Sequence, residues 1–255
     1  MYRHGLVSKP DRVPSPDECE FYHVMEVPGV GVTSGQWDLR GRLDEYLGQY
    51  VFSGKRVLEI GPASGFLTFE IERRGGAVVA VEVTDEHGWD FVPYPRASMG
   101  EYFANRARHM ERIKNSFWMA HHAFKSRATV LYGDAYDLPD ELGQFDVAVM
   151  AAVLLHCRAP LQIIEQCVRR AKAVVIVDLL YADIEGMPVC RLQPTAGNSC
   201  YDTWWNLSST YLAQFLEVLG MRTTRIHRHQ QNYVAGSKGS AQETPFFTIV
   251  AERVP

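Results

Sequence analysis

The chain has 255 residues, of which 46% are hydrophobic and 22% charged, and its formal net charge is −4. These values are those of an ordinary globular protein, and no apolar run approaches the roughly 20 residues that cross a bilayer, so we expect a soluble protein that does not enter membranes. The negative charge gives no general attraction toward nucleic-acid phosphates.

Cysteine usage and the N-terminus bear on the compartment. The five cysteines form no CxxC pair and are odd in number, which fits neither a zinc ribbon nor a disulfide framework. The first residues lack the charged-then-apolar pattern of a secretory signal. We therefore expect reduced thiols and a cytoplasmic protein.

The first 54 residues differ in character from the rest. Residues 1–20 contain three prolines and predict an irregular arm. Residues 21–54 contain aromatic side chains and glycines and end in a helix expected over 39–50. We expect residues 1–54 to form an arm and lid on residues 55–255, the two together making a single globular unit.

After residue 54, short apolar runs alternate with longer amphipathic stretches, which is typical of a parallel sheet with crossover helices. Strands are expected over 56–60, 77–83, 128–132, 145–150 and 173–179. Helices are expected over 65–74, 100–125, 160–171 and 208–219. Runs at 222–227 and 246–252 predict a closing pair of strands. The fold class is therefore α/β, a mostly parallel, Rossmann-like seven-stranded sheet with helices on both faces.

Two stretches, 84–100 and 181–207, are too long to be simple connections. Both follow expected parallel strands, and open sheets bind ligands at the carboxyl ends of such strands. We expect these two loops and the N-terminal segment to form the substrate pocket.

The segment from Glu59 to Gly65 reads E-I-G-P-A-S-G between an expected strand and an expected helix. Its glycines let the backbone approach a bound cofactor closely. Glu82, at the end of the next strand, can accept both ribose hydroxyls of a nucleoside. Asp134, after the third strand, can accept the exocyclic amine of adenine or serve as a turn residue. These features together predict a nucleoside cofactor.

The spacing within the loop distinguishes between two cofactors. Dinucleotide binding requires G-x-G-x-x-G so that helix amides meet a pyrophosphate, whereas this loop reads E-x-G-x-x-x-G. S-adenosyl-L-methionine carries no phosphate, so we expect this cofactor, with S-adenosyl-L-homocysteine as product, and a methyltransferase activity. The expected cofactor-binding residues are Glu59, Gly61, Pro62, Ala63, Ser64, Gly65, Glu82, Asp134, Ala135, Met150 and Ala151.

The acid-glycine loop, the acidic end of the second strand and the aspartate after the third strand resemble those of the class I methyltransferases. Within that group, the chain resembles the tRNA wobble-uridine methyltransferases and their relatives of unassigned substrate. The matching stretches are 21–23, 35–40, 54–61, 65–75, 117–121, 154–156 and 203–205. The resemblance implies a Rossmann-like methyltransferase domain over 55–255.

One departure from that family concerns the cofactor. Its carboxymethylating members hold an additional cofactor carboxylate with lysines of the N-terminal segment and a tyrosine after strand four. This chain has no lysine between Lys9 and Lys55, and Leu155 stands where the tyrosine would align. The resemblance therefore implies ordinary S-adenosylmethionine.

Methyl transfer from a sulfonium is an in-line displacement, so the enzyme positions the acceptor and supplies a base where the acceptor must lose a proton. His156, after the fourth strand, is the first candidate base, with a packing role as the alternative. His121 and His122 lie on the long expected helix, and at most one of them is expected to face the pocket. Methionine and other apolar side chains along 110–124 recur at helical spacing and are expected in the core.

Aromatic side chains in the second long loop could stack against a planar or sugar acceptor, or pack the loop on the core. The candidate acceptor-binding residues are His23, Trp37, Arg40, Trp118, Tyr201, Trp204 and Trp205. The end of the fourth strand offers neither the metal-binding carboxylates of catechol-type enzymes nor the N-P-P-Y type motif of base amino-methyltransferases. We expect no metal.

Three hypotheses about function follow. The favoured one is O-methylation of a small molecule, a sugar or secondary metabolite, because the chain is acidic and no nucleic-acid-binding domain is evident. A tRNA methyltransferase is the alternative, favoured by the resemblance and by basic residues between 106 and 127. The third is a module that binds S-adenosylmethionine without catalysis. A homo-oligomer stays open.

Overall fold

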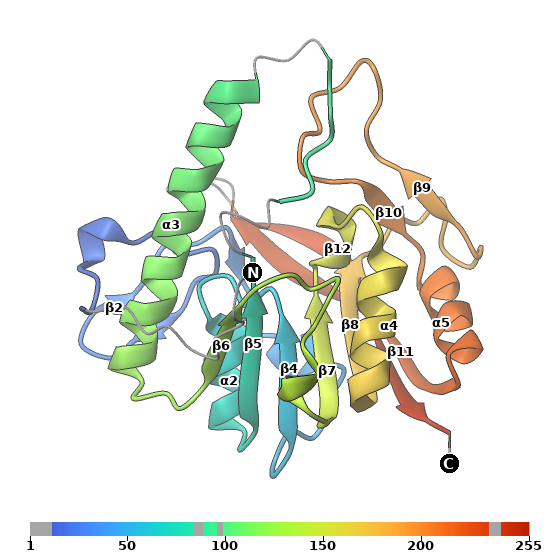
Figure 1. Cartoon of the computed structure of the whole chain (residues 1–255), viewed down its shortest axis with the longest axis horizontal. Helices are drawn as coiled ribbons and strands as arrows, with labels where there is room; N and C mark the ends of the chain where they lie inside the picture. Colours follow the sequence, from blue (N-terminus) through green and yellow to red (C-terminus); the bar gives the residue numbers. More distant parts are fainter. Residues whose placement is uncertain (1–11, 84–88, 96–98, 235–240, 255) are drawn as a thin grey trace.

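The computed structural model describes residues 12–83, 89–95, 99–234 and 241–254. Their main feature is an eight-stranded sheet with the order β3-β11-β12-β8-β7-β4-β5-β6 (Figure 1). Most of the expected N-terminal arm, and residues 84–88 and 96–98 of the first long loop, lie outside the described residues. In the described ranges, no helix has the length and apolar character needed to span a bilayer.

Five parallel strands form the centre of this sheet. They are β4 (Arg56–Ile60), β5 (Ala77–Glu82), β6 (Thr129–Tyr132), β7 (Phe145–Ala151) and β8 (Ala171–Leu179). Helices cover both faces, so the strands read as nearly continuous apolar runs rather than as alternating patterns. From β4 the chain proceeds to β5 and β6 on one side, and β7 and β8 lie on the other. The crevice where strand order reverses therefore lies between β4 and β7.

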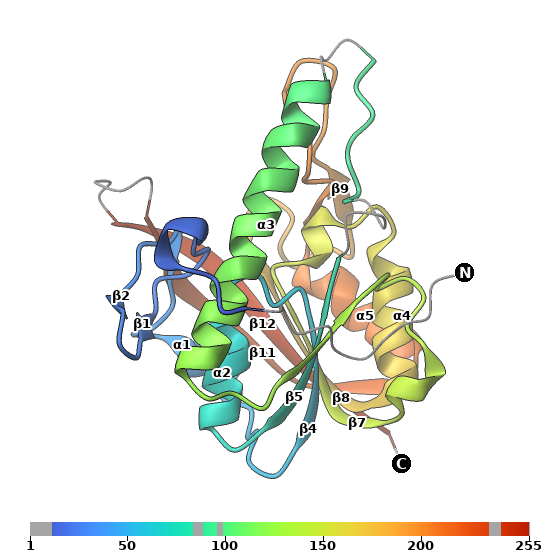
Figure 2. The same cartoon turned by 60° about the vertical axis from the view of Figure 1, so that its left-hand side comes forward.

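Helices pack on both faces of the sheet, as expected (Figure 2). Within β4, Val57 packs with α2, α3 and the N-terminal segment, whereas Leu58 points to the opposite face with α4 and α5. Both side chains are fully buried, and truncating Leu58 to alanine would cost about 2–5 kcal/mol of stability. The bounds are α1 (Leu43–Tyr46), α2 (Phe66–Arg73), α3 (Met99–Ala123), α4 (Pro160–Arg170) and α5 (Ser209–Val218).

The closing pair of strands is much longer than its apolar runs indicated. β11 spans Met221–Val234 and β12 spans Ala241–Arg253, and β12 inserts antiparallel between β8 and β11. Polar residues extend this ladder: His229 is 2.9 Å from the Thr248 hydroxyl and 3.0 Å from the amide of Gln231. Because these buried side chains hydrogen-bond to one another, they occupy strand positions that hydrophobic periodicity does not reveal.

Two expectations need correction. The sheet has eight strands rather than seven, because β3 (Trp37–Asp38) pairs with the end of β11 at the edge. The helix expected over 39–50 is confined to α1, since Gly48 and Gln49 both adopt positive φ and end it.

Short elements complete the chain. Between the N-terminal segment and the sheet, Met25, Val27 and Leu39 join the same core cluster as Val57. The second long loop contains a small antiparallel hairpin of its own, β9 with β10. The remaining bounds are η1 (Pro16–Glu18), β1 (Glu26–Val27), β2 (Gly31–Val32), η2 (Asp140–Leu142), η3 (Leu154–His156), β9 (Cys190–Leu192) and β10 (Trp205–Leu207).

Candidate functional site

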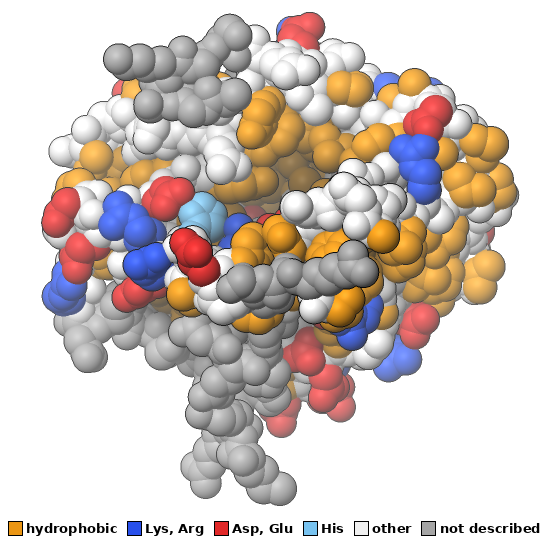
Figure 3. Space-filling view, turned by 90° about the horizontal axis from the view of Figure 1, so that it is seen from above, with side chains coloured by type: hydrophobic (Ala, Val, Ile, Leu, Met, Phe, Trp, Pro, Cys, Tyr) orange, Lys and Arg blue, Asp and Glu red, His pale blue; other side chains and the backbone are white. Residues whose placement is uncertain are grey.

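A cavity of about 470 Å³ opens at the carboxyl ends of β4, β5 and β7, at the point where strand order reverses. Figure 3 shows this face of the molecule hollowed between hydrophobic side chains. The amino-terminal half of α3 and the chain around residues 193–203 rise above the sheet (Figures 1 and 2). The volume falls in the range of small-molecule and cofactor sites, about 300–1,000 Å³.

The glycine loop forms one wall of this cavity through Gly61, Pro62 and Ala63. Gly61 has φ of 72°, and a Cβ added there would lie 3.0 Å from a methyl group of Val153. Gly65 has φ of 88° and a different reason to be glycine: an added Cβ would lie 2.5 Å from the Phe69 ring. Gly61 therefore serves the cavity, and Gly65 serves the packing of α2.

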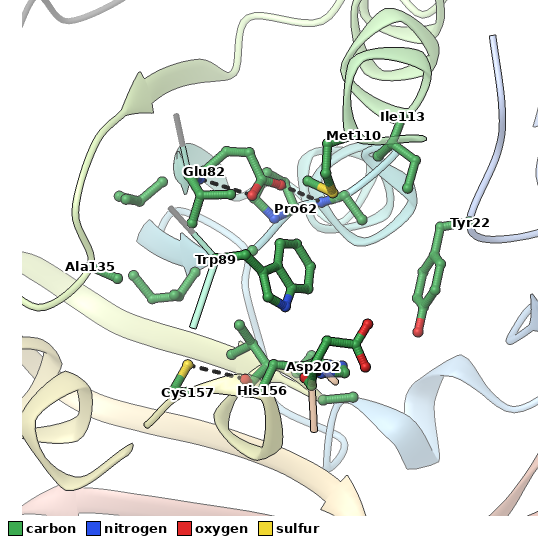
Figure 4. Close-up of a pocket in the computed structure, with 18 of the residues that line it drawn as sticks. Tyr22, Pro62, Glu82, Trp89, Met110, Ile113, Ala135, His156, Cys157 and Asp202 are labelled. Carbon is green, nitrogen blue, oxygen red and sulfur yellow. Dashed lines mark hydrogen bonds between the residues drawn. The ribbon is translucent and has the colours of Figure 1, made fainter. Parts of the chain in front are cut away.

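Glu82 lies at the end of β5 and lines the cavity beside the glycine loop (Figure 4). Its side chain is 8% exposed, and it accepts hydrogen bonds from the backbone N–H of Ala63 at 3.2 Å and of Val83 at 2.9 Å. Burial raises the pKa of Glu82, while these bonds and nearby cations oppose that rise. A carboxylate held in this way retains lone pairs for the two hydroxyls of a ribose.

The turn after β6 places Asp134 and Ala135 on the same cavity. Asp134 accepts the backbone N–H of Tyr136 at 2.8 Å, so it serves as a turn residue while lining the cavity. Across from it, Met110 and Ile113 of α3 face the glycine loop (Figure 4). Met110 is buried, as expected, and it also forms part of an apolar wall suited to a flat base.

Four expected cofactor residues support this wall from behind. Glu59 is 2% exposed and accepts a hydrogen bond from the Thr68 hydroxyl, and burial raises the pKa of Glu59 to about 7. The Ser64 hydroxyl accepts the backbone N–H of Tyr22 at 3.2 Å and so joins the N-terminal segment to the loop. Met150, like Gly65, is buried in core packing. Ala151, at the end of β7, does line the cavity.

His156 lies in η3, directly after β7, and lines the cavity opposite Glu82 (Figure 4). Its Nδ1 is 2.5 Å from the backbone carbonyl of Asp202. A carbonyl only accepts hydrogen bonds, so Nδ1 carries the proton and Nε2 carries the lone pair. Burial lowers the pKa of His156 and favours this neutral form. The ring is thereby set as a proton acceptor.

The other candidate histidines lie elsewhere or act differently. His121 is buried, and its Nε2 lies 3.0 Å from the carbonyl of Ala128. It lies beside Phe117 on the face of α3 that packs against Phe69 of α2. His122 points to solvent. His23 lines the cavity, is 7% exposed and packs against the ring of Phe66. Burial lowers the pKa of His23 to about 3, so this ring stays neutral.

Of the seven candidate acceptor residues, His23 and Trp37 line the cavity. Three of the others hold the surrounding loops: Tyr201 packs on Tyr102 at 4.6 Å, and both Trp204 and Trp205 donate their indole N–H to backbone carbonyls. Trp118 donates to the hydroxyl of Tyr132, and Arg40 pairs with Asp38 near the surface. These contacts are structural.

The cavity residues that the sequence did not indicate include Trp89, Arg106 and Asp202. The Arg106 guanidinium lies 3.8 Å from the centroid of the Trp89 ring, and the Asp202 carboxylate lies 3.8 Å from Arg106 Nη2. A signal was present in part, because Arg106 belongs to a set of cavity residues with i, i+3, i+4, i+7 spacing on α3. The set is Arg106, His109, Met110 and Ile113.

Metal binding requires several suitable side chains at one point. Within the described ranges, no three His, Cys, Asp or Glu side chains come together in such a way. Several of the acids that line the cavity are engaged by the chain itself: Asp90, for example, accepts hydrogen bonds from the Tyr136 hydroxyl and from the backbone N–H of Arg158.

Comparisons with known proteins bear on the fold. No family model and no curated protein matches this sequence. Among solved structures, the N-terminal domain of EvdMO1, crystallised with S-adenosylhomocysteine and D-fucose, is 16% identical, with 93% of each chain covered and a TM-score of 0.54. The chain has the class I methyltransferase fold.

Two further solved structures agree. A candidate RNA methyltransferase from Pyrococcus horikoshii is 13% identical, covering 84% of this chain and 81% of that one, with a TM-score of 0.54. A candidate methyltransferase from Bacillus halodurans is 11% identical, covering 84% and 100%, with a TM-score of 0.53. At these identities the likeness concerns the fold, and it does not single out the tRNA wobble-uridine family.

Proposed function

We propose that this protein is an S-adenosylmethionine-dependent methyltransferase that O-methylates a small molecule. Gly61, Glu82 and Asp134 lie where a nucleoside cofactor would meet a close backbone approach, a ribose-binding carboxylate and an adenine-binding acid. The solved structures of similar fold that contain S-adenosylhomocysteine support this cofactor.

The observation that carries the proposal is that His156 lies in the same cavity as Glu82. The contact with the Asp202 carbonyl uses Nδ1 of His156, so the lone pair on Nε2 is not used in it. S-adenosylmethionine supplies an electrophilic methyl group when bound. The chain holds the acceptor hydroxyl in line, and His156 Nε2 takes the hydroxyl proton as the new O–C bond forms and the C–S bond breaks. General-base assistance of this kind is worth roughly 10²–10⁴-fold in rate.

The surroundings of the cavity favour a small acceptor over tRNA. Basic residues of α3 diverge around the helix instead of forming one patch: Arg106 lines the cavity, Arg108 bonds Asn105, and Arg112 donates to the carbonyl of Cys19. The D-fucose in the crystals of the EvdMO1 domain supports a sugar as the type of acceptor.

The test combines binding with turnover. Calorimetry should show binding of S-adenosylhomocysteine and no comparable binding of NAD, and labelled methyl groups should pass to a hydroxylated acceptor in a panel that includes D-fucose. Preference for NAD would overturn the proposal. If the protein binds the cofactor and transfers methyl groups to tRNA but not to small molecules, tRNA is the acceptor. If it binds the cofactor and transfers methyl groups to neither, it is a cofactor-binding module without catalysis.

A further inference from the structure

Most polar groups that line the cavity already have partners within the chain. Glu82 and Asp134 accept backbone N–H groups, and Asp90 accepts a tyrosine hydroxyl and a backbone N–H. Among the described lining residues, Arg106 is the one Lys or Arg side chain. The pair formed by Arg106 and Asp202 retains hydrogen-bonding capacity, and so do Nδ1 of His23 and Nε1 of Trp89.

Arg106 and Asp202 face each other without a close contact. Their nearest nitrogen and oxygen are 3.8 Å apart, beyond hydrogen-bond range, and their side chains are 20% and 27% exposed. The Nε of Arg106 is buried and has no hydrogen-bond partner among the described residues. The other oxygen of Asp202 has a long 3.5 Å contact with the Thr203 hydroxyl, and the Tyr102 hydroxyl also interacts with the Asp202 carboxylate. An inserted group that both donates and accepts would satisfy the two charges better than they satisfy each other.

Trp89 provides a flat surface beside this pair. Its indole lies near the middle of the cavity, between Glu82 and the His156–Asp202 end (Figure 4). The ring centroid is 3.8 Å from the Arg106 guanidinium carbon and 5.8 Å from the ring centroid of His156. Trp89 Nε1 is buried and has no partner within the described chain. An aromatic face flanked by unfilled donors suits a ring with an apolar face and polar edges.

We propose that the methyl acceptor is a neutral pyranose presenting a vicinal diol, which Arg106 and Asp202 bind through one hydroxyl each while Trp89 packs against the sugar ring. This inference rests on the proposed methyltransferase function. It assigns the three residues to acceptor recognition and leaves the proton to His156.

Charge balance favours a neutral sugar over an acidic one. A carboxylate bound by Arg106 would lie next to the Asp202 carboxylate, and the two like charges would repel each other. Asp202 is held in place because its backbone carbonyl contacts His156. A cationic acceptor would in turn meet Arg106. Two opposite charges at this spacing are complementary to hydroxyls, which donate to Asp202 and accept from Arg106.

The experiment uses the full chain saturated with S-adenosylhomocysteine and measures binding of methyl pyranosides by calorimetry. A pyranoside with the vicinal diol should bind, and removing either hydroxyl should weaken binding about tenfold or more, the scale of a hydrogen bond to a charged group. The matched uronate should bind no more tightly, and the affinity should change little between 50 and roughly 300 mM salt, because no net charge is recognised.

Variants separate recognition from chemistry. Arg106→Gln and Asp202→Asn should each raise the KM for the pyranoside about tenfold, with kcat changed much less and with S-adenosylhomocysteine affinity kept. Asp202→Asn retains the backbone carbonyl that holds His156. Arg108→Gln, on the same helix but exposed and paired with Asn105, is the matched control and should match the wild type.

Each other outcome overturns the inference in an identifiable way. If no pyranoside binds, a sugar is not the acceptor. If S-adenosylhomocysteine still binds in the same titration, the methyltransferase proposal is unaffected. Tighter, salt-sensitive binding of the uronate that Arg106→Gln abolishes would identify an acidic acceptor. Loss of S-adenosylhomocysteine binding in Arg106→Gln would assign this residue to the cofactor.

Discussion

The backbone carbonyl of Asp202 lies 2.5 Å from Nδ1 of His156, although 46 positions separate the two residues. This contact selects the tautomer of the histidine, because only a protonated Nδ1 can donate to a carbonyl. The lone pair is therefore on Nε2, as a general base requires. The same residue contributes its carboxylate to the cavity. One loop thus orients the proposed base and supplies a carboxylate to the cavity.

Replacing His156 tests the base directly. We expect His156→Ala to lower kcat by roughly 10²–10⁴-fold while S-adenosylhomocysteine affinity stays nearly normal, since the ring acts on the acceptor. Steady-state kinetics and calorimetry give the two values. His122→Ala, at an exposed position of α3, is the control. A variant that loses cofactor binding or stability would instead place His156 in packing.

The pH profile gives a second reading of His156. Burial lowers the pKa of His156 below the ordinary value of 6.5, so the ring loses its proton at a lower pH than a free histidine. The active neutral form then predominates at neutral pH, and kcat should fall only as the pH drops below 6.5. An acidic limb with its midpoint above 6.5 contradicts this. His156→Ala should abolish the limb.

Glu82 should dominate recognition of the ribose. Glu82→Ala removes an acceptor of two hydroxyl hydrogen bonds, so we expect cofactor affinity to fall by roughly 1.5–3 kcal/mol in calorimetry. The exposed Glu217 on α5 provides a charge-matched control, and Glu217→Ala should bind as the wild type does. Unchanged affinity in Glu82→Ala would mean that another carboxylate holds the ribose.

The two loop glycines should respond differently to substitution. Gly65→Ala places a methyl group 2.5 Å from Phe69 at a positive φ, so overpacking and backbone strain should each cost about 1–3 kcal/mol of unfolding free energy. Gly61→Ala carries the same backbone strain, at a φ of 72°, but its methyl group meets only the Val153 side chain, at 3.0 Å beside the cavity. It should therefore cost less stability than Gly65→Ala and should weaken S-adenosylhomocysteine binding. Thermal unfolding and calorimetry separate these effects, and equal losses of stability would contradict the distinction.

Asp178 predicts a pH dependence of stability. Burial raises the pKa of Asp178 to about 7, from an ordinary value of 3.8. Between these values the folded protein binds the proton and the unfolded chain does not, so this residue makes stability fall as pH rises from about 4 to 7. The difference in unfolding free energy between Asp178→Asn and the wild type should therefore favour the variant more at pH 8 than at pH 5, by roughly 1–3 kcal/mol.

Denaturant unfolding at the two pH values measures this effect. The Oδ1 atom of Asp178 accepts the backbone N–H of Leu179 at 2.7 Å, and asparagine can keep that bond. Exposed Asp137 is the control, and Asp137→Asn should show no such pH-dependent difference. The same difference in both variants would remove Asp178 as the cause.

The parallel core and the cofactor wall could be predicted from the sequence because both follow from local order. Apolar runs such as β4 predict buried strands, and the carboxyl ends of parallel strands all lie at the same edge of the sheet. Gly61, Glu82 and Asp134 each lie at or just after the carboxyl end of a parallel strand, so their meeting on one cavity follows from chain order alone. No knowledge of side-chain packing was needed for that step.

The acceptor side of the cavity depended on tertiary structure. Strands β6, β7 and β8 of the sheet lie between Arg106 and Asp202 in the chain. Which face of α3 turns inward is decided by packing of the whole helix. His121 and His156 are equally plausible bases by residue type, yet one packs against Phe117 and the other meets the carbonyl of Asp202. Loop closure and burial are non-local, so only the folded chain determines which titratable groups share a cavity and which proton each one holds.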